Sequence, residues 1–153
     1  TKRINQIVNF AGDRLKITHW KVQGFIYIEI EFEGKGYVGL SLESPQICQR
    51  DKPLIVFSYY KVPVVYETKC KLEDGYVRIS PEISSFPWTI TGHQRIKSEN
   101  GGYKIAIKRY FGKALKSLKY ISWMYHVKSS EIKDIPTDQG VIKKLEVDGN
   151  FDL

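Results

Sequence analysis

The strongest constraint on the fold of this chain is a strict alternation of side chains over residues 25–32, FIYIEIEF. The even-numbered positions are three isoleucines and Phe32, whereas the odd-numbered positions include Glu29 and Glu31. Successive side chains of a β-strand point to opposite faces, so this pattern predicts a strand with one buried face. The turn-forming residues 33–36, EGKG, and the β-prone residues 37–42 that follow predict that the two strands pair as a hairpin.

Other segments have the composition of β-strands and are separated by residues typical of turns. They are residues 5–15, 15–19, 54–60, 62–66, 76–79, 88–91, 103–111, 120–127 and 141–147. The apolar residues 54–57 suit burial on both faces, and Pro63 favours an edge position for residues 62–66. Only residues 112–119 have helix-like spacing, over one or two turns.

These segments predict an all-β fold: a single antiparallel β-sandwich, immunoglobulin-like, of about nine to eleven strands with at most one short helix. We expect one domain over residues 1–147 and a C-terminal tail over residues 148–153, since 153 residues suffice for a single core.

The formal net charge of +7 favours an acidic partner: nucleic acid, an anionic membrane surface or an acidic protein. A lysine-rich solvated surface explains the same composition without any partner. No apolar run is long enough to cross a bilayer, and residues 1–10 lack the apolar core of a signal peptide, so we expect a soluble chain. Two cysteines are too few for a disulfide scaffold or a zinc site. A single Cys48–Cys70 bridge is compatible with an oxidising compartment, and the sequence leaves open whether it forms.

Catalytic signatures are missing from the sequence. The histidines, His19, His93 and His126, have no metal-ligand spacing, and no nucleophile elbow, P-loop or dinucleotide-binding fingerprint occurs. Glu29 and Glu31 share the outward face of a strand, where solvation explains them better than acid–base chemistry does. We therefore predict no catalytic residue and no metal site.

The order of features resembles a DOMON domain, the β-sandwich module of dopamine β-hydroxylase-like proteins and of some extracellular cytochrome domains. The resemblance lies in Trp20 before a strand, the hairpin-like residues 36–41, Asp51 before the apolar residues 54–57, Trp88, the strand from Gly102 to Arg109, and residues 120–123, YISW. It implies an extracytoplasmic (secreted or membrane-associated) protein.

Haem-binding members of that family hold haem b between an axial methionine and a histidine, and this chain departs from both. The methionine position falls on Ile47 or Cys48, and the histidine position falls near Asp138. Met124 and His126 lie two apart in one strand and cannot hold a haem from opposite sides. The resemblance therefore implies a module without cofactor, and a haem held by Cys48 and His126 is the alternative.

Aromatic and basic side chains give the remaining candidates for a binding surface. Tyrosine and tryptophan on strand faces stack against sugar rings, although they are also ordinary components of a sandwich core. Tyr59 and Tyr60 are adjacent, so one of them must leave the core. Lysines concentrate over residues 97–119. The candidate ligand- or partner-binding residues are Tyr59, Tyr60, Tyr110, Lys104, Lys108 and Arg109.

The sequence thus favours a non-catalytic binding or assembly module, a subunit or domain of a larger extracytoplasmic or membrane-associated complex with an acidic protein partner. The alternatives are a haem-binding electron-transfer module with unusual axial ligands and a carbohydrate-binding module. Nucleic acid ranks below these, because no signature of a nucleic-acid-binding fold accompanies the lysines.

Overall fold

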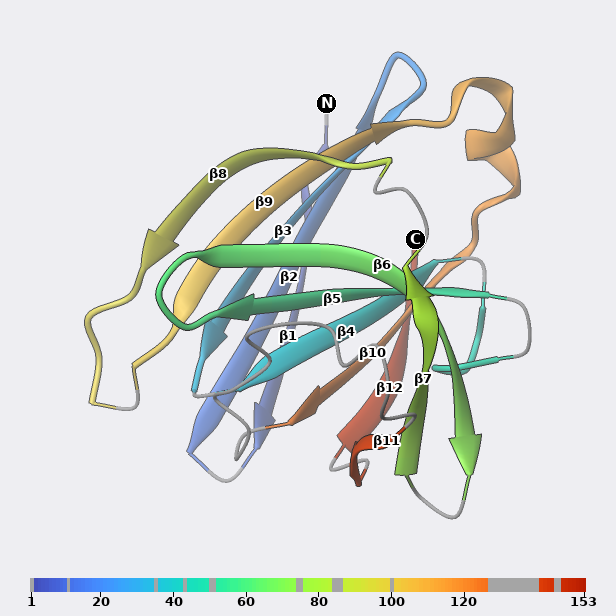
Figure 1. The fold of residues 1–153 in the computed structure, drawn as a ribbon. Helices are drawn as coiled ribbons and strands as arrows, with labels where there is room; N and C mark the ends of the chain where they lie inside the picture. Colours follow the sequence, from blue (N-terminus) through green and yellow to red (C-terminus); the bar gives the residue numbers. More distant parts are fainter. Residues whose placement is uncertain are drawn as a thin grey trace. The chain divides into compact units, whose positions relative to one another are not determined.

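The computed structural model describes the chain apart from residues 1, 11, 35, 43, 50, 51, 74, 75, 84–86, 100, 127–140, 145 and 146. At residues 10, 72, 73, 76–83, 126, 141–144, 147, 148, 150 and 152 it describes the backbone alone. The described residues form antiparallel strands and one short helix (Figure 1). They divide into a first unit, Thr1–Lys35 with Pro87–Leu118, and a second unit, Gly36–Phe86 with Lys119–Leu153. Each unit contains one sheet, and the predicted all-β antiparallel sandwich class is confirmed.

The first unit contains a five-stranded sheet in the order β1-β2-β3-β9-β8. Its elements are β1 (Ile4–Phe10), β2 (Asp13–Val22), β3 (Phe25–Glu33), β8 (Thr89–Arg95), β9 (Tyr103–Tyr110) and the 3-10 helix η1 (Gly112–Ser117). The single short helix expected over residues 112–119 is thus present.

The alternation predicted for β3 is confirmed by its burial. Ile26, Ile28, Ile30 and Phe32 are fully buried, whereas the odd-numbered residues of the strand are half-buried. Register extends this apolar face across the sheet, because Ile30 pairs with Ile17 of β2 and with Ile105 of β9. Burial of each such side chain contributes about 1.5–3 kcal/mol, so this continuous face is a main source of the sheet's stability.

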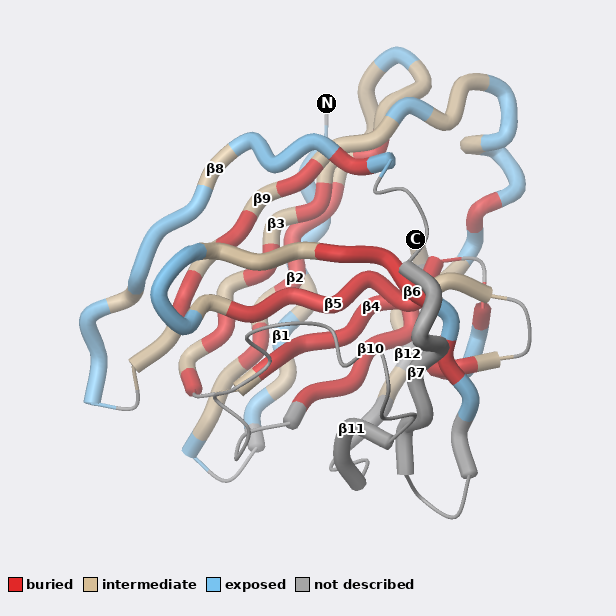
Figure 2. The backbone as a smooth tube through the Cα atoms, in the orientation of Figure 1, coloured by how far each residue is buried: buried red, intermediate tan, exposed pale blue. Residues whose placement is uncertain are grey.

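The second unit contains a seven-stranded sheet in the order β11-β7-β6-β5-β4-β10-β12. Its strands are β4 (Tyr37–Leu42), β5 (Pro53–Tyr59), β6 (Pro63–Glu73), β7 (Tyr76–Ile83), β10 (Tyr120–His126), β11 (Val141–Lys144) and β12 (Val147–Asp152). As predicted for residues 54–57, the interior of β5 is buried on both faces, which Figure 2 shows as a continuous red segment.

The predicted hairpin between residues 25–32 and 37–42 is wrong. β3 and β4 lie in different sheets: β3 pairs with β2 and β9, whereas β4 pairs with β5 and β10. The reason is that both edges of β3 are already occupied, and β4, with all six residues buried, has no polar face for an edge position. Residues 34–36 therefore connect two sheets instead of turning back along one.

Two further expectations are corrected. Residues 62–66 do not lie at an edge, because β6 pairs with both β5 and β7; Pro63 is the first residue of the strand, where its missing N–H is tolerated. Residues 148–153 are not a tail, since β12 pairs with β10 from Tyr120↔Asp152 to Tyr125↔Val147. The described part of the chain therefore contains twelve strands, one more than the upper end of the prediction.

A disulfide joins Cys48 to Cys70 in the second unit, with the two Cα atoms 4.9 Å apart. Both cysteines belong to a buried cluster with Tyr37, Ile47, Leu54, Val56, Tyr66 and Met124. Cys48 has a positive φ of 56°, a conformation that L-residues seldom adopt. The disulfide thus connects the segment after β4 to β6.

Buried serines connect the same segment to β10. The Ser122 hydroxyl donates to the carbonyl oxygens of Ser44, at 2.7 Å, and Ser41, at 3.4 Å. The Ser44 hydroxyl in turn donates to Gln49 Oε1 at 2.6 Å. Because buried polar groups are costly when unpaired, these bonds fix the route of the chain between β4 and β5.

No helix in the described part of the chain is long and apolar enough to cross a membrane.

Candidate binding surface

A row of aromatic rings crosses three strands of the first unit near one end of its sheet. Trp20 of β2 stacks on its cross-strand neighbour Tyr27 of β3, with ring centroids 5.2 Å apart and an interplanar angle of 7°. Phe25 lies 6.2 Å from Tyr27 and makes an edge contact with Tyr110 of β9, at 5.0 Å. Tyr110 is 63% exposed, so the row reaches solvent.

Cations lie over these rings. The Arg3 guanidinium is 4.1 Å from the Trp20 ring centroid, and the Lys108 ammonium is 5.5 Å from that of Phe25. Arg3 and Tyr27 thus both lie against the Trp20 ring. Each cation–aromatic contact of this kind contributes about 0.5–1 kcal/mol at an exposed site and holds the charge in place.

A tight turn holds the ends of β2, β3 and β9 together beneath this row. Gln23 and Gly24 both have positive φ, 48° and 82°, as a two-residue hairpin turn with the twist of the strands requires. The Gly24 carbonyl accepts hydrogen bonds from the amides of Phe111, at 2.8 Å, and Gly112, at 3.1 Å. A Cβ atom at Gly24 would lie 2.9 Å from the Tyr110 ring, so glycine allows the ring to rest on the turn.

A second cation–aromatic group follows β9. The Arg109 guanidinium lies 4.5 Å from the centroid of Phe111 and 5.9 Å from that of Trp88, and these two rings contact each other edge to face. Arg109 pairs with Ile26, whereas Lys108 pairs with Tyr27, so the two basic residues point to opposite faces of the sheet.

The two groups belong to one end of the first unit's sheet, which we call the cationic end: residues 2–4, 19–27, 87–91 and 107–118. Strand register brings these ranges together, with Ile4 beside His19, Phe25 beside Tyr110 and Thr89 beside Lys108. In Figure 1 the β2–β3 turn, the N-terminus and η1 lie at the top of this sheet. The basic residues of the cationic end are Lys2, Arg3, Lys21, Lys108, Arg109, Lys113 and Lys116.

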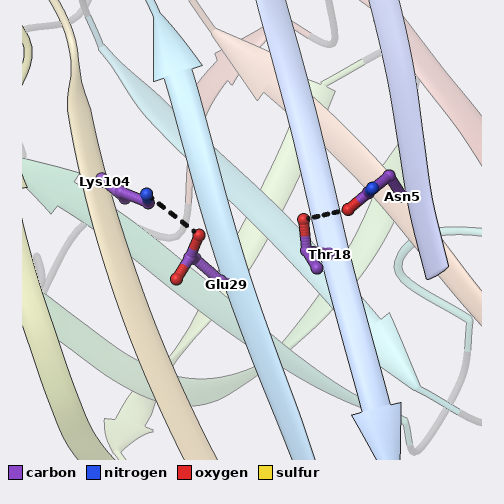
Figure 3. Close-up of polar contacts among 4 residues, drawn as sticks. All are labelled: Asn5, Thr18, Glu29 and Lys104. Carbon is purple, nitrogen blue, oxygen red and sulfur yellow. Dashed lines mark hydrogen bonds and ion pairs between the residues drawn. The ribbon is translucent and has the colours of Figure 1, made fainter. Parts of the chain in front are cut away.

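These four ranges contain seven lysine and arginine residues and no aspartate or glutamate. Farther along the same sheet the charges compensate one another. Lys104 Nζ lies 3.3 Å from Glu29 Oε1 (Figure 3). Glu31 has Lys16 and Lys104 as cross-strand neighbours. Positive charge is thus concentrated at one end of the sheet.

The predicted binding residues separate into three groups. Tyr110 and Lys108 lie together in the aromatic row, and Arg109 lies at the same end with Trp88 and Phe111. Lys104 pairs with Glu29 outside the cationic end. Tyr59, half-buried, and Tyr60, 42% exposed, belong to the second unit.

Sequence reasoning missed Arg3, Trp20, Phe25 and Tyr27 as members of this surface. The alternation in residues 25–32 already placed Phe25 and Tyr27 on the outward face, and that was the usable signal. Arg3 and Trp20 join them through strand pairing, which no local pattern shows.

Several other tyrosines and tryptophans of the strands are buried. Tyr66, Trp88, Trp123 and Tyr125 are each at most 5% exposed. Trp123 packs against Phe151 and covers Gly149, where a Cβ atom would collide with the indole. The structure therefore uses this tryptophan in packing.

Cys48 does not fit the thiolate role that the haem alternative requires, because its sulfur is bonded to Cys70. His126 contributes to β10 through its backbone, and its side chain lies outside the described residues, as do Asp51 and Asp138. Met124, at 1% exposure, lies in the buried cluster around the disulfide. Among the described residues, no group of three or more His, Cys, Asp and Glu side chains is arranged to hold a metal ion.

His19 is the buried titratable group of the cationic end. It is 1% exposed, and its Nε2 atom has no hydrogen-bond partner among the described residues. Burial, and secondarily the charge of Lys21, lower the pKa of this imidazole below its usual value of 6.5. His19 is therefore a neutral core residue near neutral pH and adds no charge to the surface.

Comparison with known proteins adds no family to this description. No protein-family model matches the chain, and searches of curated proteins and of solved structures return no match.

Proposed function

We propose that this protein is a non-catalytic binding module whose cationic end recognises an acidic segment of a partner protein. The observation that carries the proposal is the concentration of seven basic residues and six aromatic rings in four ranges that contain no acidic residue. Such a surface attracts an anionic partner over distances of about 8 Å at physiological salt and aligns it during encounter.

The stacking geometry favours carboxylates as the groups recognised. A guanidinium stacked on an indole keeps its N–H donors directed outward in its own plane, where they match the two oxygens of a carboxylate. The Arg3 guanidinium carbon lies over the Trp20 ring, 4.1 Å from its centroid, and this contact supports such a role for Arg3. The exposed ring of Tyr110, in the same aromatic row as Trp20, adds an apolar contact.

The same geometry disfavours bases and sugars, which bind by stacking on open ring faces. The Trp20 ring already contacts both Arg3 and Tyr27, and Lys108 lies over Phe25. A carbohydrate-binding function has weaker support still, because four aromatic residues of the strands, Tyr66, Trp88, Trp123 and Tyr125, are each at most 5% exposed.

The Cys48–Cys70 disulfide supports an extracytoplasmic location, since structural disulfides persist in oxidising compartments. A secreted or membrane-associated complex containing an acidic subunit fits both features. The resemblance to DOMON domains agrees with such a role, and membership of that family is part of the proposal.

The test compares probes of different chemistry. The full chain is titrated with poly-L-glutamate, with a single-stranded oligonucleotide of matched charge and with a neutral glucan, and binding is measured by calorimetry. We expect poly-L-glutamate to bind most tightly, with an affinity that decreases as salt is added. Tighter binding of the oligonucleotide or of the glucan would overturn the proposal in favour of that ligand class.

A further inference from the structure

The two edges of the first unit's sheet are built differently. β8 contains an irregularity between Ile90 and Gly92 and includes Arg95, features that discourage a further strand from pairing there. β1, INQIVNF, has no charged residue, no proline and an unbroken register with β2 from Ile4↔His19 to Phe10↔Asp13. Within the described chain, β1 pairs with β2 and with no other strand.

The open edge of β1 consists of backbone groups of alternate residues. Residues 11 and 12 separate Phe10 from Asp13, and in a two-residue hairpin the flanking residues form a hydrogen-bonded pair. Hydrogen-bonded and non-bonded pairs alternate along an antiparallel ladder, so the even-numbered residues bond to β2. Asn5, Ile7 and Asn9 therefore direct their N–H and C=O groups to the outside. Ile7 is also 47% exposed, unusually high for a large apolar side chain within a strand.

We infer that β1 is a dimerisation edge, on which a second copy of this chain adds its own β1 in antiparallel register centred on Ile7. This register is symmetric: Ile7 faces Ile7 of the second copy, and Asn5 faces its Asn9. Each outward-directed residue thereby meets another outward-directed residue, as an antiparallel ladder requires. The two sheets become one continuous sheet, in which apolar and amide side chains pair without like charges opposite one another.

Repulsion between the two cationic ends favours antiparallel over parallel pairing of the two β1 strands. The N-terminal end of β1 lies at the cationic end, since Ile4 pairs with His19 and Arg3 stacks on Trp20. Parallel pairing would bring two such ends together. Antiparallel pairing places them at opposite ends of a seven-residue strand, roughly 24 Å apart at 3.4 Å per residue. That separation exceeds the screening length of about 8 Å at physiological salt, so the positive charge does not prevent this dimer.

The same register brings the exposed Lys2 of one copy opposite Gly12 of the other, beside Asp13. A basic side chain near a carboxylate at each end of the paired strands adds a modest attraction. The dimer would display its two cationic ends in opposite directions, as a bivalent module.

The experiment measures the mass of the full chain by sedimentation over a concentration series. We expect a monomer–dimer equilibrium that Ile7→Lys shifts to monomer, because two ammonium groups would face each other across the two-fold axis. Ile7→Thr is the matched control: it keeps a β-branched neutral side chain and should retain the dimer. Circular dichroism verifies that both variants fold, as expected for a half-exposed position.

The location of the dimer interface is tested with the variant Ile7→Cys. A short bifunctional maleimide should cross-link this variant as a dimer. A chain that is monomeric throughout the concentration series would overturn the inference. So would a dimer that Ile7→Lys leaves intact or that Ile7→Cys does not cross-link, since either result places the interface elsewhere.

Discussion

The two units of this chain differ in charge and in what stabilises them. The first contains thirteen lysine and arginine residues against five aspartate and glutamate residues, a formal charge of +8, whereas the second contains eleven against twelve, a charge of −1. The second holds both cysteines and the buried serine hydrogen bonds. In the first, rings and cations stack near the surface.

If the proposed function holds, recognition belongs to the first unit, whereas the disulfide stabilises the second. The net positive charge of the whole sequence therefore comes from the first unit. Removal of the disulfide should therefore lower the stability and leave the affinity for an acidic partner unchanged. Substitution of exposed lysines of the cationic end should lower that affinity and leave the stability unchanged.

The largest effect is expected from removing the disulfide. The bond closes a loop over a sequence separation of 22 residues, for which the chain-entropy model gives about 3 kcal/mol of stabilisation. The double variant Cys48→Ala, Cys70→Ala should lose roughly that amount in urea unfolding, and reductant should no longer affect its stability. Its affinity for poly-L-glutamate should stay that of the unmodified chain. A parallel loss of affinity would show that the two units do not have separate roles.

A smaller loss is expected from Ser122→Ala. The buried hydroxyl donates to the Ser44 carbonyl at 2.7 Å, and its removal leaves that acceptor unsatisfied, at a cost of about 1–2 kcal/mol. Ser117→Ala is the matched control, because its hydroxyl makes a 2.8 Å bond to the Ala114 carbonyl at an exposed site. Chemical denaturation of both variants should show a loss only for the buried serine; equal losses would mean that burial of this hydrogen bond does not matter.

His19 should make stability depend on pH. Burial lowers its pKa in the folded protein below 6.5, so the unfolded chain binds the proton more tightly. The contribution is complete above pH 6.5 and is lost as the pH falls from there through the folded-state pKa. His19→Leu should reduce the slope of unfolding free energy against pH in this window, measured by urea unfolding at a series of pH values. An unaltered slope in His19→Leu would assign the dependence to other groups.

Much of the fold could be predicted from the sequence, because alternation is a local property. The alternation in residues 25–32 predicts which side chains of β3 are buried, and the apolar residues 54–57 predict that the interior of β5 is buried on both faces. The pairing of β4 could not be predicted, since its neighbour β10 lies about eighty residues later and the turn residues 33–36 suit either a hairpin or a crossing between sheets. The tail was mispredicted for the same reason: β12 is a strand because β10 offers it an edge.

The candidate surface was predicted in part. Lys108 and Tyr110 stood out within a lysine-rich segment. Trp20 of β2 and Arg3, just before β1, lie far earlier in the chain and join them only through the order β1-β2-β3-β9. The absence of aspartate and glutamate from the cationic end likewise involves four ranges that are separated in the sequence. It can be recognised only when the strand register that brings them together is known.

The most direct test of the central claim compares two charge-matched triple variants. Lys108→Gln, Lys113→Gln, Lys116→Gln removes three charges from the cationic end, and Lys61→Gln, Lys69→Gln, Lys71→Gln removes three exposed charges from the second unit. The account predicts that the first variant loses at least about tenfold in affinity for poly-L-glutamate, or ~1.4 kcal/mol, while the second keeps the original affinity. Equal losses in the two variants, or no loss in the first, would contradict recognition by the cationic end.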